Sequence, residues 1–116
     1  MDVAGSDAGT RQAGKTLRYG GGHPLEESVF EDVSERRRFE LRERGMTAFA
    51  NYRRENDRLV IPHVESPPPL HGKGTAGRLM TAIVDYARHH QFKITPLCPY
   101  ALSWFRRHPE YGDVLS

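Results

Sequence analysis

A run of small residues between a proline-rich segment and an amphipathic segment offers the first chemistry in this sequence. It reads His71-Gly72-Lys73-Gly74-Thr75-Ala76-Gly77. Small residues let a ligand approach the main chain closely, and the free amides at the start of a helix can point at one anion. The dipole of the first helical turn adds to this attraction, and Lys73 would supply an exposed cation. A pyrophosphate is therefore the expected occupant of the loop.

Two other phosphate-binding motifs fail against these letters. A Walker loop, G-x-x-x-x-G-K-[ST], needs Ser or Thr after the lysine, whereas Gly74 follows Lys73, and Pro67 stands where the first glycine belongs. A dinucleotide fingerprint, G-x-G-x-x-G, matches Gly72, Gly74 and Gly77 by letter. It belongs after the first strand of a parallel unit and needs an acidic residue at the end of the next strand. The strands expected here are antiparallel and no such acidic residue follows, which excludes the fingerprint.

The elements that would position this loop are strands before it and helices after it. Runs rich in alternating apolar and β-branched residues, separated by turn residues, predict strands at 29–33, 38–42, 46–52 and 58–65. The prolines at 67–69 then end strand pairing, because proline has no backbone donor.

Apolar residues at helical spacing follow the loop and predict one long amphipathic helix. They are Ala76, Leu79, Met80, Ile83, Val84 and Ala87. A short strand at 92–95 and a second helix from Pro99 to about Arg107 complete the pattern. The expected fold class is α/β of the α+β kind. It is a compact, mostly antiparallel mixed sheet of four or five strands, with one long crossover helix and a shorter C-terminal helix.

The chain of 116 residues has room for one domain, which we expect over residues 27–116. Residues 1–26 hold six of the eleven glycines and few clustered aliphatic residues, so we expect a disordered Gly-rich tail there. No apolar run resembles a signal-peptide core or a membrane span. A cytoplasmic protein without a membrane partner is expected.

Composition argues against several kinds of site. Cys98 is the only cysteine, which excludes an intramolecular disulfide and disfavours a thiolate zinc site. His89 and His90 are adjacent on a helix and point about 100° apart, so no metal is expected. The net charge is only +2, and the arginine run 36–38 is flanked by acidic residues, as is typical of a solvated strand edge. We therefore expect no nucleic-acid partner.

The loop resembles the motif Q/R-x-x-G-x-G/A of the GCN5-related N-acetyltransferases, with Gly74 and Ala76 at the small positions. The segment H-V-E-S-P-P-P-L-H-G-K-G-T-A is similar to the small YjdJ-type branch of that superfamily, which reads H-T-E-V-P-x-x-x-R-G-x-G. The segments I-T-P-L-C-P-Y-A and W-F-R-R-H-P-E-Y resemble a second signature of that branch. The resemblance covers about residues 38–115. It implies a truncated acetyltransferase fold with an unusually open acceptor side.

The resemblance also implies acetyl-CoA as the cofactor and an amine as the acceptor, either a protein lysine or a small molecule. The pyrophosphate would bind the loop from Leu70 to Ala76, and the pantetheine arm would follow the strand at 63–65. The implied cofactor-binding residues are Val64, Glu65, Leu70, His71, Gly72, Lys73, Gly74, Thr75, Ala76, Gly77 and Cys98. Because His71 replaces the usual Gln or Arg, we expect a weaker or pH-dependent cofactor affinity.

Acetyl transfer needs a base for the amine and a proton donor for the departing thiolate. His63 and Glu65 share a strand face, so either can serve as the base, or Glu65 only pairs at the sheet edge. Tyr100 is either the proton donor or a packing residue. Cys98 would sit at a helix N-cap, where the dipole favours its thiolate, and it is either a nucleophile or a small pocket-lining residue. In this branch a cysteine at this place has suggested an acetyl-cysteine intermediate, although direct transfer is the usual route of the superfamily.

Two interpretations of function remain open on these residues. The first is an acetyl-CoA-dependent N-acetyltransferase. The second is a non-catalytic CoA- or acyl-CoA-binding module that acts as a sensor or partner-binding domain. The set Glu65, Cys98 and Tyr100 separates them, because a catalyst needs at least one of the three. The oligomeric state is not predicted.

Overall fold

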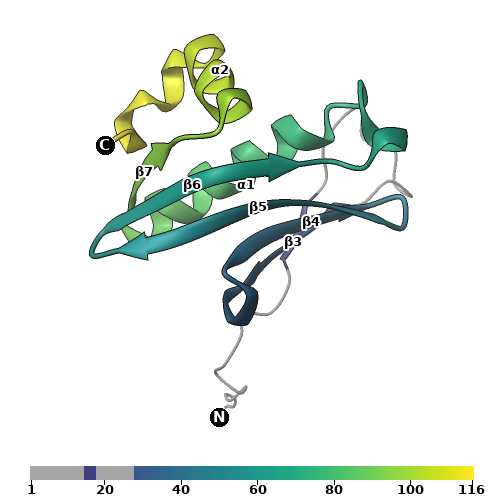
Figure 1. Ribbon diagram of the computed structural model, residues 1–116, viewed down its shortest axis with the longest axis horizontal. Helices are drawn as coiled ribbons and strands as arrows, with labels where there is room; N and C mark the ends of the chain where they lie inside the picture. Colours follow the sequence, from purple (N-terminus) through teal and green to yellow (C-terminus); the bar gives the residue numbers. More distant parts are fainter. Residues whose placement is uncertain (1–14, 18–27) are drawn as a thin grey trace.

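The computed structural model describes residues 15–17 and 28–116. The strands and helices, in chain order, are β2 (Lys15–Leu17), β3 (Ser28–Val33), β4 (Arg38–Glu43), β5 (Met46–Glu55), β6 (Arg58–Glu65), α1 (Thr75–His90), β7 (Lys93–Pro96) and α2 (Pro99–Arg107). Short 3-10 helices lie at Ser34–Arg36, Pro68–Leu70 and Pro109–Val114. The expected fold class is confirmed: a mixed, mostly antiparallel sheet with a long crossover helix and a shorter C-terminal helix (Figure 1).

The strands of the sheet lie in the order β2-β3-β4-β5-β6-β7. All neighbours are antiparallel except β6 and β7, which are parallel and joined through α1. Five of these strands lie close to the ranges that the sequence predicts. The sixth, β2, pairs with β3 from within residues 1–26, where the sequence predicts a disordered tail. The remaining residues of that stretch lie outside the described part of the chain.

One irregularity in β6 decides which side chains face the helix. The register runs from Asn51↔His63 to Arg53↔Val60, so Ile61 and Pro62 together oppose a single residue of β5. Such a β-bulge shifts the alternation of side chains by one position. As a result Val64 shares the helix-facing side of the sheet with Ile61.

The core lies between that side of the sheet and the two helices. α1 contributes Leu79, Met80, Ile83, Val84 and Ala87, all nearly or fully inaccessible, as the helical spacing predicts. α2 adds Ala101, Trp104 and Phe105. In Figure 1, β5 and β6 pass in front of α1, and no helix of the described residues lies in front of these two strands. None of the helices in the described ranges is long and apolar enough to cross a membrane.

Candidate functional site

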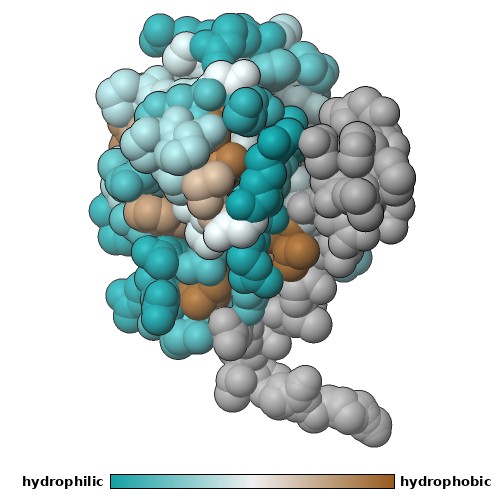
Figure 2. Space-filling view, turned by 90° about the vertical axis from the view of Figure 1, so that its right-hand side faces the viewer, coloured by the Kyte–Doolittle hydropathy of each residue, from teal (hydrophilic) through white to brown (hydrophobic). Residues whose placement is uncertain are grey.

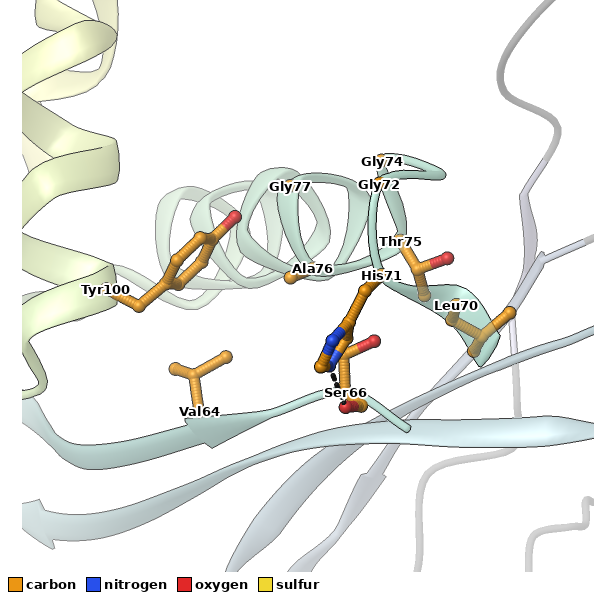
Figure 3. A pocket seen from close by; sticks show the side chains of 10 residues that line it. All are labelled: Val64, Ser66, Leu70, His71, Gly72, Gly74, Thr75, Ala76, Gly77 and Tyr100. Atoms are coloured by element: carbon orange, nitrogen blue, oxygen red, sulfur yellow. Dashed lines mark hydrogen bonds between the residues drawn. The ribbon is translucent and has the colours of Figure 1, made fainter. Parts of the chain in front are cut away.

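A cavity of about 360 Å³ opens between the end of β6, the loop before α1, the first turn of α1 and the start of α2. It is lined by Val64, Ser66, Leu70, His71, Gly72, Gly74, Thr75, Ala76, Gly77 and Tyr100 (Figure 3). Eight of the eleven residues expected to bind the cofactor are therefore brought together around one space. The other three, Glu65, Lys73 and Cys98, do not line it.

The cavity exists because β6 and β7 part after a short parallel pairing. The register ends at Ile61↔Pro96, and the amides of Leu97 and Cys98 then both donate to the carbonyl oxygen of Ile61, at 2.9 and 3.2 Å. The chain turns from there into α2. Within the described residues, no strand lies beside β6 from Pro62 to Glu65 on this side. Its free edge can pair with an extended ligand as it would with a strand.

The loop before α1 has the geometry of an anion site. Gly72 and Gly74 adopt positive φ angles of 78° and 81°, and Gly74 is the N-cap of α1 without a side-chain hydrogen bond. The first amides of the helix have no acceptor within it. The positive φ favours glycine at position 74, and a Cβ there would lie 2.9 Å from Nη1 of Arg78, so that this side chain would have to move. The loop therefore has the backbone conformation that the sequence predicts, and its binding of a pyrophosphate stays a prediction.

A buried carboxylate lies beneath this loop, and the sequence analysis did not identify it. Glu43, at the end of β4, accepts hydrogen bonds from Arg78 (Nε to Oε2 2.6 Å, Nη2 to Oε1 2.9 Å) and from Oγ1 of Thr75 (2.7 Å). The hydroxyl of Ser28 on β3 donates to it as well. Burial alone would raise the pKa of Glu43, but these hydrogen bonds outweigh burial and lower the pKa to about 2. The available signal was strand alternation, which puts Glu43 on the buried face of Phe39 and Leu41.

His71, the departure from the usual motif, lies on the cavity side of the loop. Its Nε2 donates to the carbonyl oxygen of Ser66 at 2.7 Å, drawn as the dashed line in Figure 3. The hydroxyl of Ser66 is buried and, among the described residues, has no hydrogen-bond partner. Sequence reasoning also missed Ser66. A ligand with a polar group can satisfy this hydroxyl, because Ser66 lines the cavity.

His63 and Glu65 share a face of β6, as their spacing predicts. His63 Nε2 lies 2.9 Å from Glu65 Oε1, and both side chains are about half exposed, at 49% and 58%. They lie on the side of the sheet opposite Val64, beside Phe49, whose ring centroid is 6.0 Å from that of His63. Arg38 stacks over the same Phe49 ring at 4.5 Å. The pair therefore stands outside the cavity, at the edge of the gap between β6 and β7.

Cys98 and Tyr100 begin α2, as the sequence predicts. Cys98 is the N-cap residue and is 6% exposed, packed within the core. Tyr100 reaches across the cavity from α2, and its hydroxyl lies 4.0 Å from where a Cβ on Gly77 would stand (Figure 3). Burial raises the pKa of Tyr100, so its phenol stays protonated at neutral pH.

The end of the molecule that lies at the right of Figure 1 carries the turn between β4 and β5 and the segment Pro68–Leu70. Figure 2 looks onto it and shows mostly hydrophilic residues, with apolar ones as separate spots. A ligand that reaches the loop here meets a polar surface. No group of three His, Cys, Asp or Glu side chains suited to a metal ion occurs in the part of the chain that is described.

Comparison with known protein families shows which family the chain belongs to. The model of the GCN5-related N-acetyltransferases matches residues 38–114. The chain belongs to this family, which confirms the superfamily that its motifs resemble and places it among the acetyltransferases. Among solved structures, the NMR solution structure of a GCN5-like protein from Staphylococcus aureus is similar, with 20% identity and a TM-score of 0.49, covering 88% of this chain and 87% of that one. No curated protein sequence matches the chain.

Proposed function

We propose that the protein is an acetyl-CoA-dependent N-acetyltransferase whose cofactor occupies the cavity beside the glycine loop. The observation that carries the proposal is the uncapped N-terminus of α1 beside the gap between β6 and β7. The residues present fit the group: the glycines at 72 and 74 leave room at the loop, and Ser66 offers an unpaired hydroxyl. Residues 27–116 would form the acetyltransferase domain.

The pantetheine arm would lie along the free edge of β6. Its two amides resemble a peptide, so they can pair with main-chain groups between Pro62 and Glu65 as an added strand would. Val64 and Tyr100 face each other across the cavity and would enclose the arm (Figure 3). This arrangement would bring the thioester to the place where His63 and Glu65 stand at the strand edge.

The amine would approach from the side of the sheet that carries His63 and Glu65. Glu65 would take the proton of the ammonium, directly or through His63, because their side chains are already hydrogen-bonded. The neutral amine would then attack the thioester carbonyl, and as the amide forms and the C–S bond breaks, the second proton of the amine would pass to the departing CoA thiolate. Tyr100 would donate a hydrogen bond to the departing sulfur. Full proton transfer from it is less favourable, because a phenol is a weaker acid than a thiol.

We favour direct transfer to the amine over an acetyl-cysteine intermediate. Cys98 is packed in the core and does not line the cavity, while its amide is committed to the carbonyl of Ile61. The resemblance to the YjdJ-type branch suggests the covalent route, and the two routes differ in an observable product. Only the covalent route leaves an acetyl group on the protein in the absence of acceptor.

The proposal is tested by incubating the protein with acetyl-CoA and a panel of amines, and by measuring free thiol release and intact mass. Wild type should release thiol when an accepted amine is present, while Glu65→Gln and Tyr100→Phe should be slower by about 10²-fold or less. Cys98→Ala should keep the activity. An acetyl adduct that disappears in Cys98→Ala would support the covalent route instead. If CoA binds but no amine in the panel is acetylated, the catalytic part of the proposal loses its support.

A further inference from the structure

We propose that Glu43 is a positioning residue for the cofactor loop, acting through Arg78. The inference rests on the proposed function, because it assigns the loop to the pyrophosphate of CoA. Glu43 lies on β4, outside the glycine-loop motif, and is thus an additional residue that fixes the conformation of the loop.

The contacts form a chain from the carboxylate to the loop. Arg78 donates two hydrogen bonds to Glu43 and a third, from Nη2, to the carbonyl oxygen of Lys73 at 2.8 Å. The guanidinium is planar and rigid, so fixing it on one carboxylate also fixes the direction of its remaining donors. The side chain of Glu43 is only 7% exposed, whereas that of Arg78 is 23% exposed. Without the carboxylate, Arg78 can turn toward solvent and leave Lys73.

The bond to Lys73 sets the direction of the next amide. The carbonyl of Lys73 and the N–H of Gly74 belong to one planar trans peptide unit and point in opposite directions. Arg78 holds the carbonyl, so the N–H of Gly74 points away from the guanidinium, and Gly74 lines the cavity. An anion on the loop needs such outward amides. Glu43 thereby holds the amide of Gly74 in the orientation that binding of an anion requires.

Thr75 supplies a second link between the carboxylate and the cradle. It is the first residue of α1, is 1% exposed and donates its hydroxyl to Glu43. A glutamine at position 43 would keep the shape, but its amide group has two donors and a single oxygen acceptor. It would therefore set its N–H donors against Nε or Nη2 of Arg78 in either orientation, whereas the hydroxyls of Thr75 and Ser28 can turn to accept. Glu43→Gln is the substitution that tests the charge with the least change of volume.

Asp32 provides a matched control on the same face of the sheet. Its carboxylate is also buried and also bonded to α1, through the hydroxyl of Tyr86 at 2.9 Å, and it accepts a further bond from Tyr52 at 2.6 Å. Tyr86 lies in the later half of the helix, away from the loop. If Glu43 served only the stability of the fold, Glu43→Gln and Asp32→Asn would have the same effect on CoA affinity.

The experiment measures CoA affinity by calorimetry for wild type, Glu43→Gln, Arg78→Lys and Asp32→Asn, at a temperature where each is folded by circular dichroism. Glu43→Gln should raise the Kd by about tenfold, and Arg78→Lys should raise it by less, since a lysine cannot hold both Glu43 and Lys73 in the same way. Asp32→Asn should leave the Kd unchanged while lowering the melting temperature. With an accepted amine, the KM for acetyl-CoA should rise and kcat should change little.

Equal Kd values for Glu43→Gln and Asp32→Asn would overturn the inference. If wild type does not bind CoA, the proposed function fails instead. The inference is then decided by titrating inorganic pyrophosphate and following the amide of Gly74 by NMR. That amide should shift in wild type and respond at roughly tenfold higher concentration in Glu43→Gln. The same response in both proteins, or none in wild type, would overturn it.

Discussion

Two buried carboxylates tie the antiparallel strands to α1, and they do so in different chemical ways. Glu43 is paired with a cation, Arg78, and its pKa is held at about 2. Asp32 is bonded by two phenols, and the described side chains show no cation on its oxygens. Burial, reinforced by the bonds to Asp32, raises the pKa of Tyr86 to about 12 and raises that of Tyr52 as well. The phenols of Tyr52 and Tyr86 therefore keep their protons over the ordinary pH range.

The difference lies in what each cluster does besides holding the fold. Neutral phenols suffice to fasten a strand to a helix. A cation becomes useful where a donor must also reach the main chain of the loop that we propose to bind the pyrophosphate, as Arg78 does at Lys73. On the proposal above, the Glu43 cluster serves both the stability of the fold and the cofactor loop, whereas the Asp32 cluster serves stability alone.

Removing the carboxylate of Glu43 should have the largest effect on stability. Glu43→Ala leaves Arg78 partly buried without its counter-ion, and we expect a loss of about 3 kcal/mol in the free energy of unfolding. Asp32→Ala leaves only neutral hydroxyls behind and should cost about 2 kcal/mol. Urea unfolding of both variants checks the order. A larger loss for Asp32→Ala would reverse the comparison.

The difference between Glu43 and the Asp32 cluster should also appear in how the free energy of unfolding depends on acid pH. The pKa of Glu43 lies near 4.5 in the unfolded chain and about 2 in the folded protein, so its contribution is fully present above pH 4.5 and is lost as the pH falls toward 2. We expect roughly 2 kcal/mol of it to disappear between pH 7 and pH 3. Glu43→Gln should lack this part of the acid sensitivity in urea unfolding curves, whereas Tyr86→Phe should retain it. Parallel curves for wild type and Glu43→Gln would contradict the assignment.

Tyr86→Phe should have a smaller effect. It removes one of the two donors to Asp32 and should lower the free energy of unfolding by about 1 kcal/mol, with CoA affinity unchanged. Calorimetry beside thermal unfolding separates the two quantities. A clear loss of CoA affinity would show that the far end of α1 also influences the loop.

The loop, the helix α1 and the start of α2 could be predicted because their signals are local. Apolar residues at helical spacing, glycines before a helix and Pro99 at its first position each act within a few residues. Glu43 could not be assigned its role from the sequence, since its main partner Arg78 is 35 positions away. Strand alternation places a carboxylate on the buried face but does not name what satisfies it.

The places of Val64, His63 and Cys98 around the cavity could not be predicted from the sequence for a second reason. The bulge at Ile61 and Pro62 follows from how β5 and β6 pair, and it puts Val64 rather than His63 on the cavity side. Cys98 stays out of the cavity lining although it is the N-cap residue, since the main chain at 97 and 98 is drawn to the carbonyl of Ile61. Such outcomes depend on pairing between distant segments, which local patterns do not contain.

The smallest effect is expected on the cavity side of the loop. His71→Gln restores the residue usual in the motif and should change CoA affinity by about threefold, because the imidazole lines the cavity and is bonded to the carbonyl of Ser66. Calorimetric titration with CoA tests this, with Gly112→Ala as a control because a Cβ there would meet open space. An equal Kd for wild type and His71→Gln would show that His71 does not influence CoA binding.

The central claim is that the loop before α1 holds the pyrophosphate of CoA, and a calorimetric titration of wild type and Gly74→Glu with CoA tests it most directly. A glutamate at position 74 would need a positive φ, would collide with Arg78 and would bring a negative charge to the cradle. We expect one CoA bound per wild-type chain and no measurable binding by Gly74→Glu. Equal binding by both proteins, or none by wild type, would contradict it.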